Sequence, residues 1–131
     1  MKMAATFAGR LAGIIGGIQI VLGVLFWTGH ALSLVNLHML IGMVFVLALW
    51  TLCVLGVRAH LPWGTIGFTF AWSLVVPALG MAQMGLLPGP WHWVIRVIHL
   101  AVGLVAMNLG WRLATTLGGG ARPKPRIALA A

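Results

Sequence analysis

Residues 32–57 read LSLVNLHMLIGMVFVLALWTLCVLGV, an almost unbroken apolar run with a histidine, His38, placed well inside it. A run near or above about 18 apolar residues is long enough to cross a bilayer as an α-helix. A polar side chain inside such a helix is costly in hydrocarbon and is a candidate for a functional site. This stretch therefore predicts a membrane-spanning helix that carries a functional residue.

A second apolar run, nearer the C-terminus, repeats the same pattern. In both runs a histidine, His38 or His99, is followed four residues later by a glycine, Gly42 or Gly103, and twelve residues later by a tryptophan. The chain therefore reads as two helix hairpins in tandem. Because an even number of crossings separates the copies, they have the same orientation. We expect a pseudo-two-fold axis along the membrane normal, with both histidines at similar depth.

Short turn-like stretches rich in glycine or proline divide the apolar sequence into four segments. The expected helices span about residues 11–27, 32–57, 64–87 and 91–117. The predicted fold class is an all-α membrane protein with four transmembrane helices. We expect an up-down-up-down bundle built from two tandem helix hairpins. Residues 1–117 are predicted to form this bundle, and residues 118–131 a flexible basic cytoplasmic tail.

The charge of the chain has one sign only. Among 131 residues there are eight Lys and Arg but no Asp or Glu, which gives a net charge of +8. Most of the basic residues flank one side of the predicted helices, which is the positive-inside pattern rather than a nucleic-acid groove. We therefore expect a lipid bilayer, and no nucleic acid, as partner. The expected location is a bacterial inner membrane, with both termini cytoplasmic.

The missing carboxylates exclude several functions. No Asp or Glu is present to form a general acid-base pair, a carboxylate proton relay or a site for a hard cation. The sequence therefore disfavours a proton pump or a cation-coupled transporter of the usual carboxylate kind.

Glycines are predicted to surround the two histidines. Each histidine lies about two turns beyond an outer turn, roughly 10 Å deep at about 1.5 Å per residue. Gly42 and Gly103 lie one turn further in on the same helix faces, and counting across the turns puts Gly23 and Gly80 near that level. This arrangement would leave room for a large flat ligand. Gln19, a polar residue in the first helix, is expected to donate an interhelical hydrogen bond.

Two imidazoles from separate helices, with small residues and an apolar shell around them, suit a bis-histidine haem iron. Two features of the sequence are shared with a known family. One is the pair His38 and His99, each followed four residues later by a glycine, and the other is the four predicted spans over about residues 11–117. On these features the sequence resembles the membrane b-type cytochromes, the four-helix haem-bearing proteins of electron transfer. The resemblance implies one low-spin haem b with both histidines as axial ligands of the iron.

The resemblance has further implications. Many members of that group carry two haems and four intramembrane histidines, whereas only two histidines are deep here, which implies a single haem near the outer side. The chain has no Cys-x-x-Cys-His sequence, so the haem would be bound non-covalently. The implied function is electron transfer with a redox protein or a quinone on the outer side. The chain would act alone or as a subunit of a larger complex, rather than as a stand-alone enzyme.

Arg96 is the one basic residue that falls toward the outer side, one turn before His99. It is the expected partner of an anionic haem propionate. His30 and His92 lie in the outer turns, where they either assist in this role or are interfacial histidines without a ligand.

Two other functions are open at this point. A copper or zinc site would use the four outer histidines with nearby methionines, because thioethers suit Cu(I); the residues are His30, His38, His92 and His99, with Met39, Met43, Met81 and Met84. A structural membrane subunit without a cofactor would instead satisfy both deep histidines by interhelical hydrogen bonds.

Overall fold

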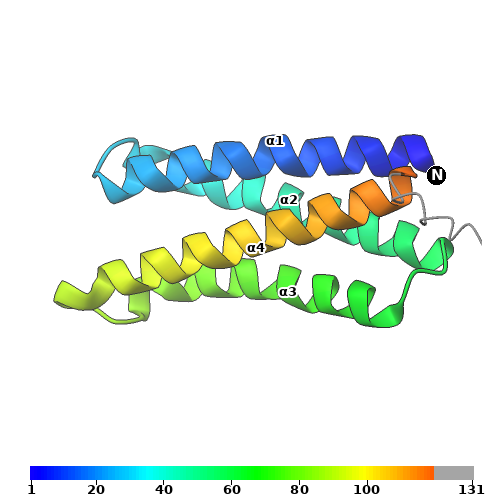
Figure 1. The fold of residues 1–131 in the computed structure, drawn as a ribbon. Coiled ribbons are helices and arrows are strands. Elements are labelled where there is room, and N and C mark those ends of the chain that lie inside the picture. The colour runs from blue at the N-terminus through cyan, green and yellow to red at the C-terminus, as the bar shows by residue number, and fades with distance from the viewer. Residues whose placement is uncertain (120–131) are drawn as a thin grey trace, which may run out of the picture.

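The computed structural model describes residues 1–119, which form four helices packed side by side (Figure 1). The helices are α1 (Lys2–Trp27), α2 (Val35–Arg58), α3 (Trp63–Ala82) and α4 (His92–Gly118), with short 3-10 turns at Leu32–Leu34, Gln83–Gly85 and Gly89–Trp91. All four are long and apolar enough to cross a membrane. The predicted up-down-up-down bundle of four membrane-spanning helices is confirmed.

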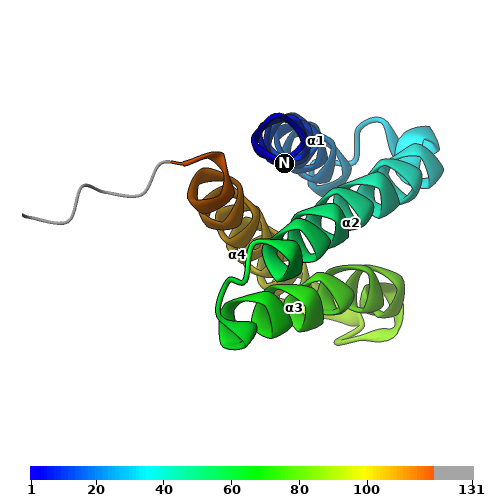
Figure 2. The ribbon, with the colours of Figure 1, turned by 90° about the vertical axis from the view of Figure 1, so that its right-hand side faces the viewer.

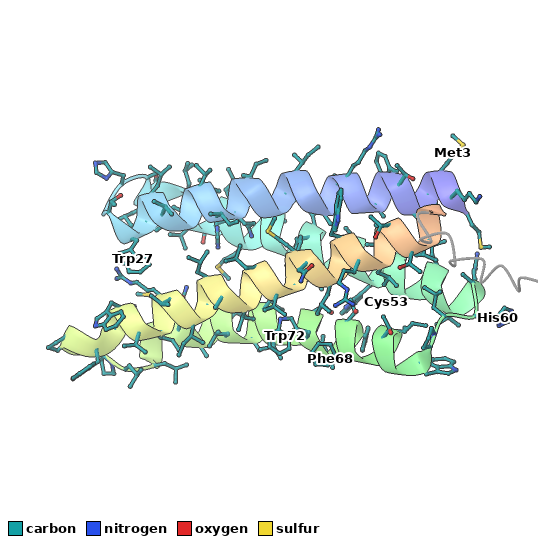
Figure 3. All side chains as sticks on the ribbon, viewed as in Figure 1. Met3, Trp27, Cys53, His60, Phe68 and Trp72 are labelled. Carbon is teal, nitrogen blue, oxygen red and sulfur yellow. The ribbon has the colours of Figure 1, made fainter. Side chains whose placement is uncertain are left out.

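The bundle has two distinct ends. Figure 1 shows the α1–α2 and α3–α4 turns at its left end, and the N-terminus, the α2–α3 turn and the end of α4 at its right end. We call these the His30 end and the Arg58 end. In Figure 3, Trp27 lies at the former, and Met3 and His60 at the latter.

The helix boundaries differ from the prediction in three places. α2 begins at Val35, after the 3-10 turn at Leu32–Leu34, rather than at residue 32. α1 begins at Lys2 rather than at residue 11, because Ala5, Ala8 and Gly9 are buried residues of this first part, and Ala114 of α4 packs against Gly9. α3 ends at Ala82 and continues only as a 3-10 turn, short of the predicted residue 87. Most of the predicted basic tail, residues 120–131, lies outside the described residues.

The two histidine-bearing helices form the central diagonal of the bundle. α2 and α4 contact each other, whereas within residues 1–119 α1 and α3 do not (Figure 2). The two helices approach closely where Leu49 of α2 packs on Gly110 of α4, since a Cβ at position 110 would lie 2.6 Å from Cδ2 of Leu49. These two residues occupy equivalent positions in the two hairpins, and the pseudo-two-fold axis stays a prediction from the sequence.

The buried core occupies the Arg58 end and the middle of the bundle. One cluster joins Ala5, Ala8, Leu52, Cys53, Leu55, Ile66, Leu113 and Ala114, and the other joins Ala12, Ile15, Phe45, Ala48, Leu49 and Ala106. Every member lies closer to the Arg58 end than the histidine on its own hairpin does. Toward the His30 end, α4 diverges from α1 (Figure 1). The two buried clusters therefore leave out the part of the bundle that carries the histidines.

Candidate functional site

The helix face of α2 that carries His38 is the face that enters the core. His38, Gly42, Phe45, Leu49 and Leu52 follow one another at alternating intervals of four and three residues, which places them on one side of the helix. Phe45, Leu49 and Leu52 are buried. The His38 side chain therefore begins from the core-facing side of α2, about two turns before the first buried residue of this face, Phe45.

α4 repeats this arrangement at equivalent positions. Arg96, His99, Gly103, Ala106 and Leu113 lie on one side of this helix, and both Ala106 and Leu113 are buried. His99 is half-buried, whereas Arg96, one turn nearer the His30 end, is exposed.

Three enclosed polar atoms in this part of the bundle have no hydrogen-bond partner. They are Nδ1 of His38, Nδ1 of His99 and Oε1 of Gln19, and they are the full set of such side-chain atoms in the part of the chain that the structure describes. Burying a polar group without a partner costs about 1–3 kcal/mol. Packing alone gives no reason for three such atoms to gather here.

The surroundings of His38 come mainly from α1. The Nε2 amide of Gln19 donates a hydrogen bond of 2.9 Å to the His38 carbonyl oxygen, which confirms the predicted interhelical bond. The Phe26 ring meets the His38 ring edge-on, with centroids 5.3 Å apart. Gly23 lies between Gln19 and Phe26 on the same face of α1, and a Cβ there would meet nothing within 4 Å. Open space therefore borders His38 on this side.

His99 packs on α3. A Cβ at Gly80 would lie 3.2 Å from Cε1 of His99, so glycine at this position lets the imidazole approach α3 closely. A Cβ at Gly103, one turn further along α4, would meet nothing within 4 Å. We call His38, His99, Gln19, Phe26 and Gly80 the histidine layer.

The two predicted partner glycines, Gly42 and Gly103, have different surroundings. A Cβ at Gly42 would lie 2.6 Å from Nε2 of Gln19, so the Gln19 side chain already fills this space. The alignment that pairs His38 with His99 also pairs Gln19 with Gly80. Because α3 has glycine where α1 has glutamine, no side chain covers Gly103.

The other candidate residues stay near their own turns. Nδ1 of His30 lies 3.1 Å from the hydroxyl oxygen of Thr28, and Nδ1 of His92 lies 3.2 Å from the carbonyl oxygen of Leu86. Within residues 1–119, no three His, Cys, Asp or Glu side chains come together as a metal-binding group. The convergence of four histidines that a copper or zinc site would need is therefore absent from the described part of the chain.

Sequence reasoning overlooked Phe26 and assigned Gln19 only a structural role. The signal was present in the spacing, because Gln19, Gly23 and Phe26 stand at intervals of four and three residues on one face of α1. What could not be read from the sequence is that this face of α1 meets His38.

No protein-family model, curated protein or solved structure matches this chain.

Proposed function

We propose that this chain is a membrane b-type cytochrome that holds one haem b between His38 and His99 and serves in electron transfer. The observation that carries the proposal is the state of the two imidazoles. They come from equivalent positions on the central helix pair, their Nδ1 atoms are enclosed without partners, and open space adjoins Gly23 and Gly103.

The residues present fit this cofactor in three respects. Imidazole nitrogens are common axial ligands of haem iron, and two of them from opposite helices fill both axial positions. A Cβ at Gly23 or at Gly103 would meet nothing within 4 Å, so both positions leave room for a bulky ligand. Arg96 stands exposed on the His99 side of α4, toward the His30 end, where a guanidinium would bind an anionic propionate.

A bound haem b would supply a reversible one-electron couple. His38 and His99 would both hold the iron, and a haem held by two imidazoles would serve electron transfer rather than oxygen chemistry. The buried cluster around Phe45, Leu49 and Ala106 would exclude water from the side of the layer that faces the Arg58 end. Arg96 would hold the polar edge of the cofactor toward the His30 end.

The two competing functions are less well supported. A copper or zinc centre built on the four histidines is not supported, because within residues 1–119 no three His, Cys, Asp or Glu side chains come together. A purely structural role was expected to satisfy both deep histidines by hydrogen bonds, yet both Nδ1 atoms lack a partner.

The location and partners follow from the same proposal. The basic residues of the described helices lie mostly toward the Arg58 end, with Lys2, Arg58 and Arg112 against Arg96 near the other end. By the positive-inside rule the Arg58 end faces the cytoplasm, together with both termini, in a bacterial inner membrane. The haem would then exchange electrons with a redox protein or a quinone at the outer side.

The test is the visible spectrum of the full chain purified in detergent. We expect a sharp Soret band with split α and β bands on reduction, and loss of this low-spin spectrum in His38→Ala and in His99→Ala. His60→Ala is the matched control, because His60 is exposed in the α2–α3 turn and should keep the wild-type spectrum. A colourless wild-type protein, or an unchanged bis-imidazole spectrum in both variants, would contradict the proposal.

A further inference from the structure

The Gln19 side chain forms a hydrogen bond through its amide nitrogen but not through its amide oxygen. Its Nε2 donates to the His38 carbonyl oxygen at 2.9 Å and fills the space that Gly42 leaves. Its Oε1 is enclosed and accepts no hydrogen bond. An amide oxygen has two lone pairs that can accept hydrogen bonds. The Gln19 side chain therefore holds an unused acceptor in the same layer as the two imidazoles.

The two unpaired imidazole nitrogens need such an acceptor. A histidine that binds a metal through Nε2 carries its proton on Nδ1, and this N–H almost always donates to an oxygen that fixes the ring orientation. Among the enclosed, unpaired side-chain atoms of residues 1–119, Oε1 of Gln19 is the one acceptor, and the other two are the histidine Nδ1 atoms themselves.

We propose that Gln19 is a positioning residue for His38, and this inference rests on the proposed haem site. Its N–H group fixes the backbone of residue 38, and its Oε1 accepts the Nδ1 proton of the His38 imidazole when Nε2 binds iron. His38 is the ring concerned because it belongs to the residue that Gln19 already binds.

With Gln19 in this role, the two histidines that would hold the haem differ from each other. Gly80 stands at the position in the second hairpin that Gln19 occupies in the first, and glycine has no side-chain acceptor to offer to His99. Hydrogen bonding to Nδ1–H makes an imidazole a stronger electron donor, which stabilises the ferric state. Gln19 therefore lowers the midpoint potential through one ligand only.

The experiment compares Gln19→Met and Gln19→Glu in the purified haem-loaded full chain. Gln19→Met removes the acceptor at similar side-chain length, so the midpoint potential should shift to more positive values. Haem affinity should fall by about 10- to 100-fold, the usual effect of losing the outer partner of a metal ligand. Gln19→Glu keeps an acceptor oxygen, so its potential should stay at or below that of the wild type.

Asn108→Leu is the matched control, because it removes an amide from an exposed position of α4 outside the histidine layer. It should change neither the potential nor the haem affinity. A role of Gln19 in helix packing alone would leave the potential of Gln19→Met at the wild-type value as long as the bis-imidazole spectrum is intact. That result overturns the role of Gln19 only. A wild-type protein without a bis-imidazole spectrum overturns the haem site and this inference together.

Discussion

Gly103 is the residue at which the proposed cofactor and simple helix packing predict opposite results. No atom lies within 4 Å of a Cβ built at this position, so a larger side chain meets no clash. Leucine also has a higher helix propensity than glycine by up to about 1 kcal/mol. We expect Gly103→Leu to leave the stability of the cofactor-free bundle unchanged or raised, and to lower haem occupancy because leucine fills the space beside His99.

Gly67→Leu is the control for this prediction. Gly67 is exposed on α3, and a Cβ there also meets nothing within 4 Å, but it lies toward the Arg58 end, away from the histidine layer. The measurements are the haem-to-protein ratio and the free energy of unfolding in detergent. Wild-type haem content in Gly103→Leu would show that the open space serves no cofactor.

The sequence pattern predicts equivalent surroundings for Gly42 and Gly103, and nothing in that pattern could have shown that they differ. Their surroundings differ because Gln19 covers Gly42 while Gly80, at the corresponding position, leaves Gly103 uncovered. Which residue of one helix lies over which residue of its neighbour depends on the axial offset of the two helices. Spacing within a helix does not determine that offset.

At the scale of the helices, long apolar runs were enough to predict four spans and their order. The start of α1 was missed because Lys2 and Arg10 suggested a polar entrance to the helix. Small residues in that part, among them Ala8 and Gly9, instead let α1 and α4 approach closely. Helix ends that are stabilised by contacts with another helix are hard to read from local sequence.

The crossing of α2 and α4 gives a prediction about helix packing. A Cβ at position 110 would lie 2.6 Å from Cδ2 of the fully buried Leu49. Gly110→Ala should therefore destabilise the bundle by about 1–3 kcal/mol, the usual cost of overpacking a core. Adding Leu49→Ala to Gly110→Ala should cost less than the sum of the two single changes, with a coupling free energy of about 0.5–3 kcal/mol.

The measurement is unfolding of the purified chain in detergent, and the control is Gly13→Ala. A Cβ at Gly13 of α1 meets nothing within 4 Å, so this change should not destabilise the bundle. Strict additivity of the Gly110 and Leu49 changes would mean that α2 and α4 do not touch at this point.

At the scale of the whole molecule, packing and charge both differ between the two ends. The buried clusters and the basic residues Lys2, Arg58 and Arg112 lie toward the Arg58 end or the middle, and the histidine layer lies toward the His30 end. Along α2, at about 1.5 Å per residue, His38 is roughly 10 Å from the His30 end and roughly 30 Å from Arg58. An electron would therefore have a short path to one membrane surface and a long path to the other.

This difference in distance predicts the side on which the protein exchanges electrons. With the Arg58 end in the cytoplasm, ferricyanide, which does not cross membranes, should oxidise the reduced haem quickly in right-side-out vesicles and far more slowly in inside-out vesicles, because tunnelling weakens steeply with distance. His30→Cys and His60→Cys, labelled with an impermeant thiol reagent, report the orientation independently, since Cys53 is buried. Labelling of position 60 from outside would reverse the charge-based orientation. Equal oxidation rates from both sides, with labelling confined to position 30, would instead show that the haem does not lie near the His30 end.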